Sequence, residues 1–239
     1  MVSDHCAGGD ALSLKVCSFD LDDTLYPEAE FVRGGLRAAE AELSSVIGRD
    51  CTSLFLSALE EGGPSWVFDR GLAAIGVQRD EALLARLVNA FRTHRPSITP
   101  HPGVVELLDA LKRRGLALAL ITDGPLEVQQ SKWAALPLGP FFDLVVFTAD
   151  VHGKSCPKPD TAAFRLVEER LGAHGSEVVH AGDNPARDFP APDALGWRTV
   201  RVRFPQGYHI SDPDPLGSGR IEVFSVRELQ RVIEGMCLD

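Results

Sequence analysis

Apolar residues are distributed along this chain in two patterns, and each pattern predicts one kind of element. Short, almost wholly apolar runs between polar turns predict buried strands. They extend from Val16 to Asp20, Leu116 to Thr122, Leu144 to Thr148, Val178 to Ala181 and Arg198 to Val202. Helical spacing is found at 104–114, 128–136, 162–171 and 226–236. Because strands and helices alternate, we predict an α/β fold with a Rossmann-like parallel sheet.

The segment between Tyr26 and Pro100 differs from the rest. Its apolar residues recur at intervals of three and four, which predicts helices, and it contains no period-2 strand pattern. Gly62-Gly63-Pro64 and the stretch from Gly71 to Gly76 are expected to separate these helices. The predicted domains are an N-terminal tail at 1–13, an α/β core at 14–26 and 99–239, and a small all-helical cap at 27–98.

Prolines are expected to limit regular structure near the C-terminus. The stretch 205–219 is rich in Pro, Asp and Gly, which predicts a loop. Pro190 and Pro192 should shorten the helix that follows Asp188, because proline cannot donate a helical hydrogen bond.

Composition and charge narrow the class of protein. The 239 residues are 44% hydrophobic and 24% charged, as in ordinary globular proteins. A formal net charge of −10 argues against a basic face for nucleic acid. The five cysteines form no C-x-x-C pair, and the sequence contains neither a signal-peptide pattern nor an apolar run of membrane-spanning length. These features predict a cytoplasmic protein without a membrane partner. The oligomeric state stays open.

Polar residues that are candidates for catalysis or ligand binding lie where the predicted strands end. In chain order they are Asp20, Asp22 and Asp23, then Thr122, then Lys158 before a helix, then Asp183 and Asp188. Ligands of open parallel sheets bind at the carboxyl ends of strands. Several carboxylates at one point suit Mg²⁺, and a neighbouring lysine and hydroxyl would hold phosphate oxygens. Taken alone, the first Asp-rich group is equally well explained as a solvated turn.

Four ordered groups resemble the motifs of the haloacid dehalogenase-like (HAD) hydrolase superfamily. They are Asp20-x-Asp22-x-Thr24, the hydroxyl of Thr122, Lys158-Pro159-Asp160 and Gly182-Asp183-x-x-x-x-Asp188. Four motifs in order, each at a strand end or helix start, are far more specific than any one of them. The resemblance extends from about Val16 to Val202, and it is to the phosphatase-type branch with a helical cap inserted after the first motif.

The resemblance implies a role for each of these residues. Asp20 would be the nucleophile and a Mg²⁺ ligand. Asp22 would act as general acid and then base, and would bind Mg²⁺ through its backbone carbonyl. Thr122 and Lys158 would hold the phosphoryl group, with Lys158 also restraining Asp20. The remaining Mg²⁺ ligands would be Asp183, directly, and Asp188, directly or through water.

Two positions depart from the family pattern. Asp123 stands where such proteins often have Asn, beside the predicted phosphate-binding residues. It is a candidate for that phosphate-binding group, although we favour a carboxylate tied into the turn or capping the next helix. Lys154 is a rival of Lys158 for the phosphate, but the Pro-Asp that follows favours Lys158.

Position 22 separates the related chemistries. The dehalogenases of the superfamily lack Asp there, whereas Asp22 supplies a proton donor for an oxygen leaving group. No lysine lies between Tyr26 and Pro100, so the Schiff-base chemistry of the phosphonate-cleaving relatives lacks its nucleophile. We expect a Mg²⁺-dependent phosphomonoester hydrolase that forms an aspartyl-phosphate. The alternatives are a phosphomutase and a non-catalytic protein that binds phosphate esters.

The predicted cap offers few candidates for substrate binding. Phe31, Arg33 and Arg37 follow the first motif and are candidates to face the crevice, although a solvated helix face is the interpretation we favour for the arginines. A cap of this size is expected to close over a small phosphate ester and to exclude a phosphoprotein. We therefore expect a sugar phosphate or a nucleoside monophosphate as substrate.

Overall fold

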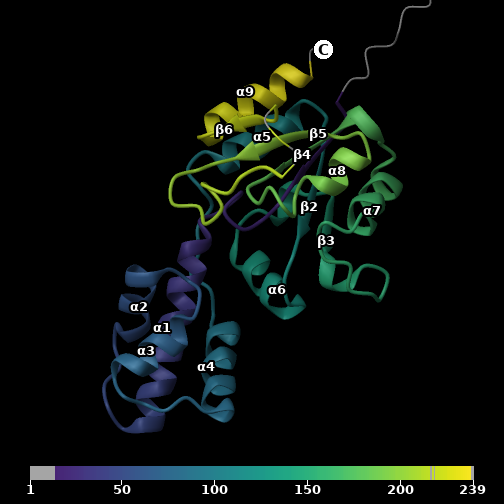
Figure 1. Cartoon of the computed structure of the whole chain (residues 1–239). Helices are drawn as coiled ribbons and strands as arrows, with labels where there is room; N and C mark the ends of the chain where they lie inside the picture. Colours follow the sequence, from purple (N-terminus) through teal and green to yellow (C-terminus); the bar gives the residue numbers. More distant parts are fainter. Residues whose placement is uncertain (1–13, 216, 218, 238–239) are drawn as a thin grey trace, which may run out of the picture.

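A parallel sheet forms the centre of the protein. The structure is a computed structural model, which describes residues 14–215, 217 and 219–237 (Figure 1). In this part of the chain one six-stranded sheet has the order β3-β2-β1-β4-β5-β6, and every neighbouring pair is parallel. The strands are β1 (Val16–Phe19), β2 (Ala117–Thr122), β3 (Leu144–Phe147), β4 (Val178–Gly182), β5 (Arg198–Val202) and β6 (Ile221–Val223). The predicted α/β class is confirmed, and the predicted tail at 1–13 lies outside the described residues.

Helices cover both faces of the sheet (Figure 1). One face packs against α5 (Val104–Arg113) and α9 (Val226–Met236), and the other against α7 (Ala162–Leu171) and α8 (Pro190–Ala194). Successive residues of β1 point to opposite faces, since Cys17 and Phe19 belong to the first apolar cluster and Val16 to the second. Burial on both faces explains why the strands appear in the sequence as nearly continuous apolar runs.

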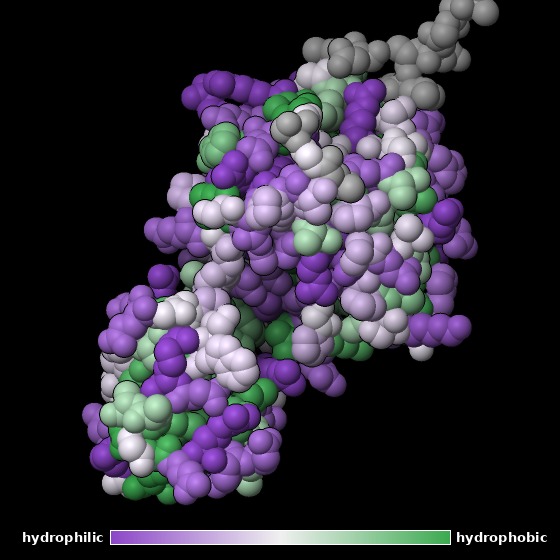
Figure 2. Space-filling model, in the orientation of Figure 1, coloured by the Kyte–Doolittle hydropathy of each residue, from purple (hydrophilic) through white to green (hydrophobic). Residues whose placement is uncertain are grey.

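Between β1 and α5 the chain forms a helical insertion, which the structure describes throughout. It consists of α1 (Glu28–Ile47), α2 (Leu54–Gly62), α3 (Val67–Ala74) and α4 (Glu81–Thr93), with no strand among its residues. These helices share an apolar cluster of their own, whose fully buried members include Leu36, Leu43, Phe55 and Leu87. In Figure 2 the insertion projects from the core as a separate lobe.

The helix break expected in the stretch from Gly71 to Gly76 falls toward the C-terminal end of that stretch. Gly71 lies inside α3 and does not separate two helices. A Cβ atom at this position would lie 2.5 Å from Cδ1 of Phe55, so the glycine allows α3 to approach the ring on α2 closely. Gly76, at the other end of the same stretch, has φ +69° and does follow the end of α3.

The C-terminal region contains one strand that the sequence pattern did not predict. β6 is only three residues long and pairs with β5 at the edge of the sheet. The described residues of 205–219 contain neither helix nor strand, as expected, and α8 after Asp188 is a short helix of five residues. The remaining elements are α6 (Leu126–Ala135) and the 3₁₀ turns η1 (Gly139–Phe141), η2 (Thr148–Asp150) and η3 (Gly175–Glu177). Among the described residues, no helix combines the length and the apolar character needed to cross a membrane.

Candidate active site

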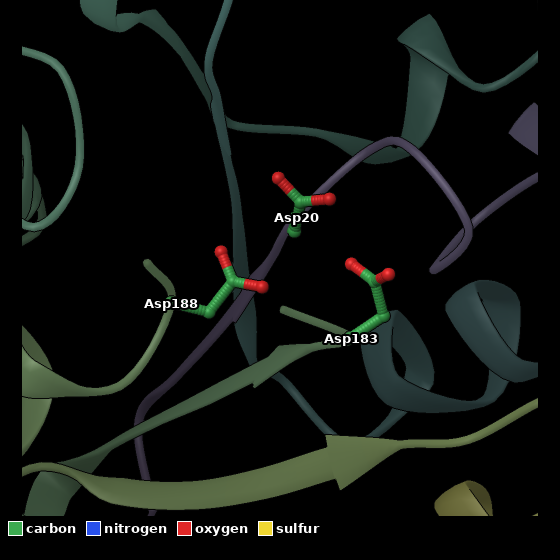
Figure 3. A group of neighbouring side chains, drawn as sticks. All are labelled: Asp20, Asp183 and Asp188. Carbon is green, nitrogen blue, oxygen red and sulfur yellow. The ribbon is translucent and has the colours of Figure 1, made fainter. Parts of the chain in front are cut away.

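Three carboxylates from two distant parts of the sequence converge at the carboxyl ends of β1 and β4. Asp20 follows β1 directly, Asp183 follows β4, and Asp188 lies in the loop after β4. The two strands are hydrogen-bonded neighbours, which brings their ends together. One oxygen from each carboxylate lies within 4.8 Å of the others, and Figure 3 shows the three groups pointing toward a common space. All three residues are buried.

Lys158 binds two members of this acidic group. Its Nζ atom lies 2.5 Å from Oδ1 of Asp20 and 2.5 Å from Oδ1 of Asp188. The lysine side chain is 3% exposed, so its charge is almost fully removed from water and is compensated by these carboxylates. Lys154, the rival of Lys158 in the sequence, is exposed in the turn after η2.

Burial and mutual repulsion dominate the electrostatics of the cluster. Burial raises the pKa of Asp20 to about 7, with Lys158 opposing the rise and Asp188 and Asp22 adding to it. Burial also raises the pKa of Asp183, and the charges of Asp188 and Asp20 raise it further. Burial alone would raise the pKa of Asp188, but the Lys158 ammonium, the nearby His180 and the hydrogen bond from the backbone of Asn184 together lower that pKa. A second cation would therefore stabilise the fully ionised cluster.

The chemistry of the cluster fits a hard divalent cation. All its donors are carboxylate oxygens, the ligand type that such cations prefer. Oδ2 of Asp183 is buried and has no hydrogen-bond partner within the described part of the chain, which leaves one ligand atom free. Buried polar atoms normally have partners, so this one is suited to a cation. The hydroxyl of Thr122, at the end of β2, is likewise buried without a partner in the described residues.

The carboxylate of Asp22 is held by three donors. The hydroxyl of Tyr26 donates to Oδ1, the amide of Gln129 donates to Oδ2 at 2.9 Å, and Nζ of Lys132 lies 2.7 Å from Oδ1. Sequence reasoning missed Gln129 and Lys132 as site residues. Both lie on α6, three residues apart, and that spacing on the helix after the second motif is the signal that could have identified them.

Asp123 is tied into the turn that follows β2. Its carboxylate accepts hydrogen bonds from the hydroxyl of Thr148 and from the backbone N–H of Lys158 at 3.0 Å. The guanidinium of Arg187 lies 2.6 Å from its other oxygen. Asp123 therefore fixes the backbone that carries Lys158, and its charge is paired.

A cavity of about 310 Å³ opens over the carboxylates. Its walls include Asp20, Asp22, Lys158 and Asp183 from the core. Residues of the helical insertion complete the walls, namely Glu28, Phe31, Val32, Phe91 and Arg92. The cavity is thus formed by both parts of the molecule, with the acidic cluster on the core side.

The two candidate arginines of the insertion lie elsewhere. Arg33 and Arg37 are exposed on α1, and neither lines the cavity over Asp20. Arg33 lines a different cavity of about 240 Å³, next to Tyr208 and Pro64. Of the three residues proposed from this helix, Phe31 alone lines the cavity over the carboxylates.

Comparisons with known proteins agree with this geometry. The profile of the haloacid dehalogenase-like hydrolase family matches residues 14–196. A glyceraldehyde 3-phosphate phosphatase of Methanocaldococcus jannaschii is 29% identical over 196 residues, covering 79% of this chain and 85% of that protein. A phosphoglycolate phosphatase of Caulobacter vibrioides is 30% identical over 191 residues, covering 77% of this chain and 75% of that protein.

The same fold is present among solved structures. The HAD-hydrolase YfnB from Bacillus subtilis, solved with bound magnesium, has a TM-score of 0.68 and 18% identity, with 92% of this chain and 99% of that chain covered. At that identity the likeness shows the fold alone. The family profile, however, covers more than half of the sequence, so the chain belongs to the haloacid dehalogenase-like hydrolase family. It is an enzyme of the phosphatase type, as predicted.

Proposed function

We propose that this protein is a Mg²⁺-dependent phosphomonoester hydrolase that acts on a small phosphorylated metabolite through an aspartyl-phosphate on Asp20. The observation that carries the proposal is the convergence of Asp20, Asp183 and Asp188 around a cavity that also contains Lys158. A carboxylate is a competent nucleophile toward a phosphoryl group whose charge is neutralised. The relatives named as phosphatases support the same reaction class.

In the first half-reaction, a carboxylate oxygen of Asp20 attacks phosphorus. The Asp20–phosphorus bond forms, the ester bond breaks, and the departing oxygen takes a proton from Asp22. Lys158 restrains Asp20 through Oδ1, which leaves the other oxygen to attack. The unpartnered hydroxyl of Thr122 and the ammonium of Lys158 are the groups that we expect to hold phosphoryl oxygens.

In the second half-reaction, water attacks the aspartyl-phosphate. Asp22, now ionised, removes a proton from that water, and phosphate leaves while Asp20 is regenerated. Asp20, Asp183, Asp188 and the backbone carbonyl of Asp22 are the groups that would hold Mg²⁺. The ion supplies charge neutralisation of the phosphate oxygens when bound.

The size of the cavity favours a small substrate. Ligand cavities commonly measure about 300–1,000 Å³, and the cavity of about 310 Å³ lies at the lower limit. Of the two predicted substrate classes, a sugar phosphate with a short carbon chain fits this volume better than a nucleoside monophosphate. The two relatives act by name on glyceraldehyde 3-phosphate and phosphoglycolate, which are esters of this size.

Phosphate release from a panel of short sugar phosphates, phosphoglycolate and nucleoside monophosphates tests the proposal. We expect release from a narrow subset with Mg²⁺ and none with a chelator. Asp20→Asn should abolish release with an unchanged circular dichroism spectrum, whereas Asp109→Asn, which alters an exposed ion pair with Arg113, should leave release intact. Isomerised product exceeding released phosphate would indicate a phosphomutase. Tight binding without turnover would indicate a binding protein.

A further inference from the structure

A buried lysine on α6 contacts the group that we assign as the acid/base. Lys132 is 4% exposed, and its Nζ atom lies 2.7 Å from Oδ1 of Asp22. Removing a lysine charge from water is costly unless a carboxylate compensates it, so this contact fixes both side chains. Lys132 does not belong to the four motifs, and the proposed reaction does not use it.

The surroundings leave Lys132 little freedom. Its ammonium lies 4.5 Å from the centroid of the buried Phe31 ring, a cation–π distance, and 3.9 Å from Oε1 of Glu28. Both residues belong to the first turns of α1, which leads from the core into the insertion. Lys132 therefore joins three segments: the loop that carries Asp22, the core helix α6, and the beginning of α1.

Gln129 supports the same arrangement from one turn earlier on α6. It is 3% exposed, and its amide nitrogen donates to Oδ2 of Asp22 at 2.9 Å and also to the backbone carbonyl of Asp123. With Lys132 and the Tyr26 hydroxyl on Oδ1, both carboxylate oxygens of Asp22 have defined donors. A carboxylate bound in this way has a fixed position and plane.

We propose that Lys132 is a positioning residue that orients the Asp22 carboxylate for proton transfer, with Gln129 completing the arrangement. The inference rests on the proposed function, because it assigns Lys132 a task only if Asp22 transfers protons. Correct placement of an acid/base group is a large part of its effect, and a displacement of about 1 Å can cost about a hundredfold in rate.

Dependence on the leaving group distinguishes this role from a structural one. An alkyl phosphate needs a proton on its departing oxygen, whereas 4-nitrophenyl phosphate releases a stable phenolate without one. We expect Lys132→Met to lower kcat/KM for an alkyl phosphate by about tenfold, which is part of the roughly 100-fold to 10,000-fold that acid catalysis commonly contributes. The same variant should lower kcat/KM little for 4-nitrophenyl phosphate. Mg²⁺ binding, measured by calorimetry, should be unchanged.

Matched variants separate the outcomes. Lys112→Met removes another lysine that pairs with an aspartate, Asp143 at 2.8 Å, remote from the cavity, and should change neither kcat/KM value. Tyr26→Phe removes only a hydroxyl from Asp22 and should show the leaving-group effect even if Lys132→Met does not fold.

Three results would overturn the inference. Equal losses for both substrates would mean that Lys132 serves the fold, and a rise in KM alone would mean that it binds substrate directly. Unchanged constants in both Lys132→Met and Tyr26→Phe would show that neither donor positions Asp22. A wild-type protein inactive toward both substrates would remove the proposed function itself, which distinguishes that failure from the other three.

Discussion

At the scale of single residues, the site combines buried carboxylates that repel one another with a lysine that neutralises two of them. Asp20, Asp183 and Asp188 lie close together, and Lys158 forms ion pairs with two of them, Asp20 and Asp188. Such a cluster costs the metal-free protein stability, because carboxylates that would ionise freely in water are held close together. We expect that cost to be measurable.

The pH dependence of stability should reveal Asp20. Burial raises its pKa to about 7, from about 3.8 in the unfolded chain. Between these values the folded protein binds one more proton than the unfolded chain, so this group lowers the free energy of unfolding as pH rises from about 4 to 7. In chelator, Asp20→Asn should therefore gain stability relative to wild type as pH rises through this range. Denaturant unfolding at several pH values measures this gain in stability. A difference in the free energy of unfolding between the two proteins that does not change with pH would contradict the prediction.

The sequence predicts most of the residues that the structure brings together in the candidate site. It does not predict those whose partners are determined by tertiary packing. Asp20, Asp183 and Asp188 stand at strand ends, where parallel topology alone brings them together. The spacing of Gln129 and Lys132 places both on one face of the helix after the second motif, but only the packing of that helix beside the Asp22 loop shows which group they contact.

At the scale of elements, continuous apolar runs and glycine-terminated helices were sufficient to locate most of the core. The helix at 162–171 was predicted with the bounds that α7 has, and β5 likewise matches 198–202. β6 escaped prediction because three residues are too few for a periodic signal. Within the stretch from Gly71 to Gly76 the sequence could not show that the break falls after Gly71, because a helical glycine at a close contact has the same sequence signature as a break.

The close approach of α3 to α2 predicts an effect of enlarging Gly71. A Cβ atom there would lie 2.5 Å from the Phe55 ring, so Gly71→Ala should destabilise the insertion by about 1–3 kcal/mol, the usual cost of overpacking. Gly235→Ala is the matched control, since a Cβ on that helical glycine of α9 meets no atom within 4 Å. The control should be neutral or stabilising by up to about 1 kcal/mol. Thermal unfolding of both variants checks this, and equal effects would argue against the packing account.

At the scale of the whole molecule, the cavity over Asp20 is shared between the core and the insertion. The core supplies the acidic cluster, and the insertion supplies Phe31, Phe91 and Arg92. The acidic cluster thus comes from the core motifs, which the sequence identifies. The residues that line the cavity from the insertion depend on how α1 and α4 pack, which is why Arg33 and Arg37 could not be placed from sequence.

Binding of Mg²⁺ should stabilise the whole protein. A ligand whose concentration is a hundred times its dissociation constant adds about 2.7 kcal/mol to the free energy of unfolding. For a chain of this size, each kcal/mol of added stability raises Tm by about 2–4 °C. We expect Mg²⁺ to raise Tm by several degrees relative to chelator at equal ionic strength, and Asp183→Asn to lose most of that shift while gaining stability in chelator. Differential scanning calorimetry measures both, and an undiminished shift in Asp183→Asn would place the ion elsewhere.

Trapping the covalent intermediate tests the central claim most directly. Asp22→Asn, mixed with 4-nitrophenyl phosphate and Mg²⁺ and quenched in acid, should carry a phosphoryl group on the peptide that contains Asp20, because the base for the second half-reaction is missing. The double variant with Asp20→Asn, which has no nucleophile, should carry none. The aspartyl-phosphate mechanism would be contradicted if the wild type releases nitrophenol but neither the wild type nor Asp22→Asn carries a phosphorylated peptide at any quench time.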